Sequence, residues 1–156
     1  MCKGACSGEF TKERIQASPL KVSELRHIRE LLYMCEDLRV CLFCGALLME
    51  AYCTARWGDL MRAESAIAGC DRHGKLQFLE ARTGRHKTMK SQMHRHQFLP
   101  VLAPCHGIDG RDWGSAWIKV RDTMKLEWPP MGLIMPAPGL QGQATSRPLE
   151  TQECAP

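Results

Sequence analysis

The longest apolar stretch of the chain is VCLFCGALLM, residues 40–49, flanked by Arg39 and Glu50. A helix that crosses a membrane needs about twenty apolar residues, so a run of this length predicts a buried helix instead. The apolar pattern continues from about Leu38 to Tyr52 and covers most faces, which is typical of a helix at the centre of a domain. We therefore expect the rest of the chain to fold around this helix.

The residues on either side of the run predict two further helices. Apolar residues before it recur at intervals of three or four, namely Leu25, Ile28, Leu31, Leu32 and Cys35. This spacing predicts an amphipathic helix that ends near Asp37. After the run, Leu60 and Met61 predict a third helix from Arg56 to about Ala66, which the glycine of Ala68-Gly69-Cys70 would end.

The second half of the chain predicts a small sheet and one more helix. Residues 75–81 alternate loosely and residues 97–102 are apolar, so we expect two antiparallel strands inserted between helices. Trp113 and Trp117 lie four residues apart and mark an amphipathic helix whose tryptophans belong to the core. The predicted fold is mainly α with a small antiparallel β-sheet insertion.

Composition divides the chain into three parts. Residues 1–18 show no sustained periodicity and are expected to form a disordered arm, residues 19–128 one domain, and residues 129–156 an irregular tail rich in proline and glycine. Within the tail, residues 131–136 are expected to make one extended segment. The first twenty residues contain no apolar core of a secretory signal, which indicates an intracellular protein, nuclear if the source is eukaryotic, with no membrane role.

The chain contains nine cysteines. Without an export signal they are expected to be free thiols in a reducing compartment. Cys41 and Cys44 have the spacing of a redox pair, but they lie inside a helical pattern and are predicted to be core residues. A zinc site at Cys105, His106, His94 and His96 is disfavoured because the cysteines are not paired as zinc ligands usually are. We expect neither a metal nor another cofactor.

Positive charge is concentrated in one segment. No acidic residue lies between Glu80 and Asp109, whereas five basic residues do: Arg82, Arg85, Lys87, Lys90 and Arg95. Charge alone fits a solvated cationic hairpin equally well. A basic segment of this kind can also contact phosphates without reading a base sequence.

Two short motifs bear on the choice between these interpretations. They are CTARWGDL, residues 53–60, and RHKT, residues 85–88. Together they resemble the first arginine box and the β-hairpin lysine of tyrosine recombinases, the phage-integrase-type enzymes that break and rejoin DNA. The resemblance begins at PLKVSEL, residues 19–25, and extends to about Pro100. The family usually has Thr-Gly where this chain has Cys53-Thr54, whereas Arg56, Asp59 and Leu60 are kept.

The resemblance implies a role for each matched residue. Arg56 would hold the non-bridging oxygens of a phosphodiester, for which a planar guanidinium is suited. Asp59 would orient Arg56, although a surface ion pair without function would have the same spacing. Lys87 would protonate the leaving 5′ oxygen, with Lys90 as the alternative, and Arg82, Arg85, Lys87, Lys90 and Arg95 would bind the DNA backbone.

Other parts of that active site have no counterpart in this sequence. No histidine follows His106, so the His-x-x-Arg box is missing, and the only tyrosines, Tyr33 and Tyr52, precede Arg56. Without a nucleophile no covalent DNA intermediate forms. We therefore expect a partial, truncated recombinase-like domain, from a mobile element or an incomplete gene, that binds the DNA backbone but does not cleave DNA on its own. Its expected role is in DNA recombination or integration, with a complementing recombinase half or a homo-oligomer as further partner. The alternative is a non-enzymatic helical interaction module whose basic hairpin contacts protein or RNA.

Overall fold

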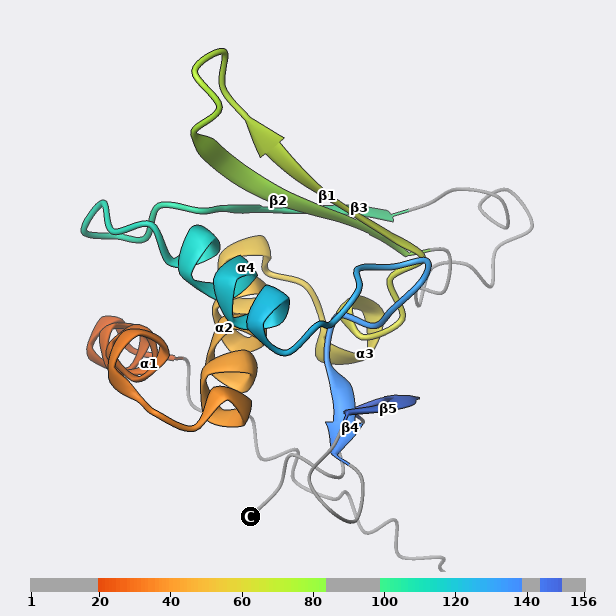
Figure 1. Ribbon diagram of the computed structural model, residues 1–156. Coiled ribbons are helices and arrows are strands. Elements are labelled where there is room, and N and C mark those ends of the chain that lie inside the picture. The colour runs from red at the N-terminus through yellow and green to blue at the C-terminus, as the bar shows by residue number, and fades with distance from the viewer. Residues whose placement is uncertain (1–19, 84–98, 139–143, 150–156) are drawn as a thin grey trace, which may run out of the picture.

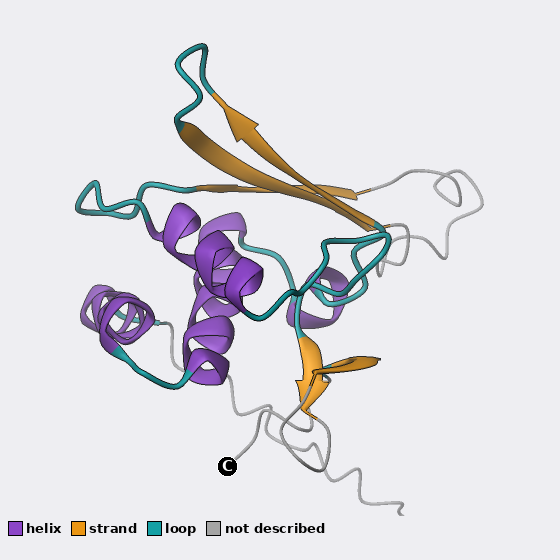
Figure 2. Ribbon diagram, viewed as in Figure 1, coloured by secondary structure: helices purple, strands orange, loops and turns teal. Residues whose placement is uncertain are grey.

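The computed structural model describes residues 20–83, 99–138 and 144–149 (Figure 1). In chain order the elements are α1 (Val22–Met34), α2 (Leu38–Cys53), α3 (Trp57–Leu60), β1 (Ser65–Cys70), β2 (Leu76–Thr83), β3 (Leu99–Pro104), α4 (Trp113–Thr123), β4 (Pro136–Pro138) and β5 (Ala144–Pro148). Figure 2 shows the helices gathered on one side of a sheet. The predicted combination of helices with a small antiparallel sheet is confirmed.

Helix α2 is the centre of the fold, as its apolar run predicts. It packs against α1, α4 and β3 and begins at Asp37, whose carboxylate accepts a hydrogen bond from the backbone N–H of Arg39. Asp37 therefore caps the start of α2, and the preceding helix ends earlier, at Met34. Within the described ranges, no helix is long and apolar enough to cross a membrane.

Two tryptophans join α4 to α2 and to the sheet. Trp113 and Trp117 are fully buried, which confirms their predicted place in the core. The Trp117 indole donates a hydrogen bond to the Leu42 carbonyl (3.0 Å), and the Trp113 indole donates one to the Pro104 carbonyl (2.9 Å). Each ring thus buries its area while its N–H stays hydrogen-bonded.

The sheet has three antiparallel strands in the order β1-β2-β3. Its helix-facing side carries Leu79, Ala81, Val101 and Ala103, all buried, as expected for alternate positions along paired strands. On the opposite side Ile67, Glu80 and Leu102 are cross-strand partners. Ile67 and Leu102 are about half exposed, so this outer side of the sheet is partly apolar and open to solvent.

The helix predicted from Arg56 to about Ala66 is wrong. Helix α3 has four residues, and the segment expected to close a longer helix is the strand β1. In β1 small or apolar side chains occupy both faces, so the sequence carries no polar alternation that would identify a strand. Pairing with β2 decides the conformation, because Ala66 and Ala68 stand opposite Ala81 and Leu79 on the side that faces the core.

The segment after residue 128, expected to be an irregular tail, contributes to the core. It contains β4 and β5 and four buried apolar residues: Ile134, Met135, Ala137 and Leu149. The extended segment predicted for residues 131–136 begins only at Pro136. The indole N–H of Trp57 donates to the Leu149 carbonyl (3.0 Å), so the last described residues are held against α3.

Candidate nucleic-acid interface

Arg56 lies at the turn between α2 and α3. Helix α2 ends at Cys53, and the next residue, Thr54, has the left-handed backbone conformation with φ 52° and ψ 25°. The chain then runs extended to Arg56, which precedes the first residue of α3 with φ −83° and ψ 141°. The Arg56 side chain is exposed. A guanidinium in this place can reach an anion that approaches from solvent.

Thr54 occupies the position where the resemblance places a glycine. Glycine adopts positive φ without strain, whereas a β-branched residue does not. The structure nevertheless puts Thr54 in that conformation, which glycine usually occupies just after a helix. The backbone therefore follows, with threonine at this position, a path that suits glycine.

Replacing Thr54 with glycine is expected to raise the free energy of unfolding by about 0.5–1 kcal/mol. The left-handed conformation costs an L-residue roughly 1–2 kcal/mol, and the greater flexibility of glycine in the unfolded chain offsets about half of that. Urea denaturation of the two proteins measures the difference. Thr54→Ala serves as the control because alanine keeps the Cβ and should not show this gain. A Thr54→Gly variant less stable than wild type would contradict the proposed backbone strain at Thr54.

Asp59 does not pair with the Arg56 guanidinium. Its backbone N–H donates to the Arg56 carbonyl (2.9 Å), which closes the first turn of α3. Within the part of the chain that the structure describes, neither residue takes part in a side-chain ion pair. The expected orienting contact is thus not present, and the Arg56 side chain is available to an external anion.

The turn that carries Arg56 lies beside one end of the sheet. Helix α3 packs against β2 (Figure 1), and the Thr83 hydroxyl donates to the Arg62 carbonyl just beyond α3 (3.4 Å). The Glu64 N–H donates to the Arg82 carbonyl (2.7 Å) at the same end. Thr83 pairs with Leu99, so the connection formed by residues 84–98 leaves and rejoins the sheet there.

Most of the predicted DNA-binding residues belong to that connection. Arg85, Lys87, Lys90 and Arg95 lie outside the described residues, so the structure gives no position for them. The connection that contains Lys87 links two strands, β2 and β3, that are antiparallel partners.

Arg82 is the one predicted DNA-binding residue whose side chain is described. It is half exposed, and its Nε lies 2.6 Å from a carboxylate oxygen of Glu80 on the same strand. An exposed ion pair of this kind contributes about 0–1 kcal/mol. Arg82 could therefore exchange Glu80 for a phosphate, but the nearby carboxylate would oppose an anion.

Sequence reasoning missed Glu50, an acidic group near the Arg56 turn. Its side chain lies in the last turns of α2, and a hydrogen bond from the Trp57 backbone favours its charged form. Burial is the larger effect and raises the pKa of Glu50 above its ordinary value. The only sequence signal was the position of Glu50 directly after the apolar run, within the predicted central helix.

The two tyrosines differ in their surroundings. The Tyr52 ring stacks on Trp113 with centroids 5.6 Å apart, and its hydroxyl accepts a hydrogen bond from the Ile108 N–H (3.3 Å). Tyr33 lies on α1 and is 39% exposed, although partial burial raises its pKa. The packed surroundings of Tyr52 agree with the expectation of a structural role, whereas Tyr33 lies at the surface.

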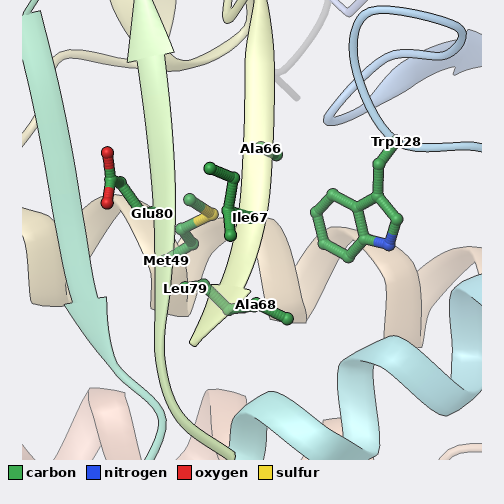
Figure 3. A pocket seen from close by; sticks show the side chains of 7 residues that line it. All are labelled: Met49, Ala66, Ile67, Ala68, Leu79, Glu80 and Trp128. Atoms are coloured by element: carbon green, nitrogen blue, oxygen red, sulfur yellow. The ribbon is translucent and has the colours of Figure 1, made fainter. Parts of the chain in front are cut away.

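A small pocket beside β1 is a separate feature (Figure 3). Its lining is almost entirely apolar and comprises Met49, Ala66, Ile67, Ala68, Leu79, Glu80 and Trp128. The one ionisable side chain is Glu80, which pairs with Arg82. The pocket therefore suits an apolar group and offers no set of residues for acid–base or nucleophilic chemistry.

The described residues form no metal-binding cluster, and comparison with known proteins identifies no relative. No three His, Cys, Asp or Glu side chains of residues 20–83, 99–138 and 144–149 lie close enough to hold a metal ion. Searches against protein-family models, curated proteins and solved structures find no significant match.

Proposed function

We propose that this chain is a tyrosine-recombinase-like domain that binds the phosphate backbone of DNA through Arg56 and the basic hairpin connection. The observation that carries the proposal is that the turn with Arg56 lies beside the end of the sheet where the connection containing Lys87 begins and ends. Arg56 follows the central buried helix, and Thr83 and Leu99, which flank that connection, lie at the end of the sheet beside α3.

The chemistry of Arg56 supports this proposal. A phosphodiester carries its charge on two non-bridging oxygens, and a guanidinium can donate to both at once. Arg56 is exposed and has no carboxylate partner among the described residues. Its left-handed approach through Thr54 matches a position where the resemblance places glycine.

The first test is the salt dependence of DNA binding. Changing Arg85, Lys87 and Lys90 to alanine is expected to weaken binding to a short duplex and to reduce the log–log salt slope. Each lost phosphate contact lowers the magnitude of that slope by about 0.9. Binding should not depend on base sequence, because phosphate contacts do not read bases. Fluorescence anisotropy over a series of salt concentrations measures both quantities.

The β1–β2 turn offers a matched control. Arg72 and Lys75 are exposed and lie at the opposite end of β2, roughly 25 Å away for a strand of this length. Changing both to alanine removes two positive charges and should leave the slope almost unchanged, and the pair Lys87→Ala and Lys90→Ala is its charge-matched counterpart in the connection. Equal effects of the two variants would mean that binding depends only on net charge and not on the basic connection. Tighter binding to RNA of the same sequence would favour the alternative of an interaction module.

The second test concerns strand cleavage. The chain alone is expected to form no covalent adduct with a nicked suicide DNA substrate, because the sequence offers no tyrosine downstream of Arg56. Arginine and a proton donor stabilise a transition state but supply no nucleophile. A denaturing gel detects the adduct. An adduct abolished by Tyr33→Phe or Tyr52→Phe would overturn this expectation.

A further inference from the structure

Three cysteines gather at the corner between α1 and α2. Cys35 follows the last residue of α1, and Cys41 and Cys44 lie in the first turns of α2. The Cys41 thiol donates to the Cys35 carbonyl (3.1 Å) and, less closely, to the Leu31 carbonyl (3.7 Å). The thiol of Cys41 is thus held against the residue that ends α1.

The three thiols differ in their access to solvent. Cys35 is partly exposed, whereas Cys41 and Cys44 are 2% and 3% exposed. Burial raises the pKa of Cys41, and it raises the pKa of Cys44 to about 11, so both are protonated at neutral pH. The Cys41 thiol also lies against the backbone of Cys35, whose carbonyl accepts its hydrogen bond. A small oxidant would therefore meet Cys35 first, with Cys41 next to it.

We propose that Cys35 and Cys41 are a peroxide-sensitive pair that forms a disulfide between the end of α1 and the first turn of α2. The Cys35 thiolate attacks one oxygen of hydrogen peroxide, which gives a sulfenic acid and hydroxide. The Cys41 sulfur then attacks the sulfenic sulfur, its proton joins the departing hydroxyl, and water leaves. In sum, two thiols and one peroxide give one disulfide and two waters.

Cys44 is not an equivalent partner for Cys41. The two residues are three positions apart within α2, where side chains of regular helical neighbours have Cβ atoms roughly 5–6 Å apart. A disulfide needs Cβ atoms about 3.5–4.5 Å apart. Cys35 lies at the end of a different helix and is free of this constraint, so it is the residue that Cys41 can reach. The pair is independent of the proposed DNA binding.

Trypsin separates the candidate partners and makes the proposal easy to test. Cleavage after Arg29, Arg39 and Arg56 places Cys35 in the peptide of residues 30–39, whereas Cys41, Cys44 and Cys53 lie together in the peptide of residues 40–56. The full-length protein is treated with dilute hydrogen peroxide, its remaining thiols are alkylated, and the digest is analysed by mass spectrometry. We expect the two peptides joined by one disulfide, two hydrogens lighter than their sum.

Single variants then identify the sulfur atoms. Cys35→Ser and Cys41→Ala should lose the joined peptides, whereas the buried control Cys44→Ala should keep them. Cys35 is the only cysteine of its peptide, so Cys35→Ser shows only that the two peptides are joined by a disulfide. Survival of the joined peptides in both Cys44→Ala and Cys53→Ala identifies Cys41 by exclusion, even if Cys41→Ala folds poorly. The proposal is overturned if wild type yields only separately oxidised cysteines, or if the joined peptides persist in Cys41→Ala.

Discussion

Replacing Gly45 with alanine is expected to lower the free energy of unfolding by about 3 kcal/mol, near the upper end of what overpacking a core costs. A Cβ at Gly45 would overlap the indole ring of Trp117. That ring has no room to move, because it is fully buried and its N–H is held by the Leu42 carbonyl. Helix propensity alone would predict the opposite, since alanine is favoured over glycine inside a helix by about 1 kcal/mol.

Gly58 provides the matched control for this prediction. It lies in α3, and a Cβ placed there would have no neighbouring atom within 4 Å. Gly58→Ala should therefore follow propensity and gain up to about 1 kcal/mol. Denaturant titrations followed by circular dichroism measure both variants. If both variants change the free energy of unfolding in the same direction, contact with Trp117 does not determine the effect of Gly45→Ala.

A double variant separates the contact from other causes. If the overlap with Trp117 is responsible, Gly45→Ala should cost less in a Trp117→Leu background than in wild type. The difference between the two costs is the coupling energy of the pair, which is commonly about 0.5–3 kcal/mol for residues in contact. If Gly45→Ala costs the same in both backgrounds, α2 accommodates the added methyl group by a shift that does not involve Trp117.

The central helix and the tryptophan pair could be predicted because their signals are local. An apolar run of helical length and two tryptophans four residues apart each specify a buried face without reference to distant residues. Strand β1 could not be predicted in this way. Its small side chains fit a helix as well as a strand, and the choice depends on pairing with β2, residues 76–83.

In the candidate site, too, features with a local sequence signal could be predicted, whereas features that depend on tertiary structure could not. The position of Arg56 after the buried helix follows from the sequence, and so does the hairpin connection that contains Lys87. The ion pair between Arg82 and Glu80 depends on side-chain conformations along a strand. The absence of a side-chain contact between Arg56 and Asp59 goes with the extended backbone of Arg56, which precedes α3, whereas the sequence pattern predicted a helix from Arg56 onward.

Arg121 is expected to be the second position of large effect, with Arg121→Met costing about 4 kcal/mol or more of unfolding free energy. The side chain is fully buried in α4. Its guanidinium donates to three backbone carbonyls, those of Glu127, Leu133 and Ile134. It also lies 4.0 Å from the centroid of the Trp128 ring. One side chain thus holds the segment that leads to β4.

Two opposing effects decide the sign of this prediction. Burial lowers the pKa of Arg121 to about 10, a shift that corresponds to roughly 3 kcal/mol of unfavourable desolvation, which methionine would relieve. Against this, each hydrogen bond to a charged group is worth about 1.5–3 kcal/mol, and three carbonyls would lose their donor. The cation–π contact with Trp128 adds about 2 kcal/mol when desolvated. The lost contacts outweigh the relief.

The residues that lose protection in Arg121→Met distinguish a local role of the guanidinium from a general loss of core packing. In Arg121→Met, backbone amides of residues 127–137 should lose protection from hydrogen exchange before those of α2 do, because only the former depend on the guanidinium. Trp128 should become more exposed, which fluorescence quenching detects. Arg121→Lys keeps the charge but not the planar guanidinium group, so its stability should fall between those of wild type and Arg121→Met. Uniform loss of protection in α2 and the C-terminal segment would mean that Arg121 supports the whole core rather than this segment.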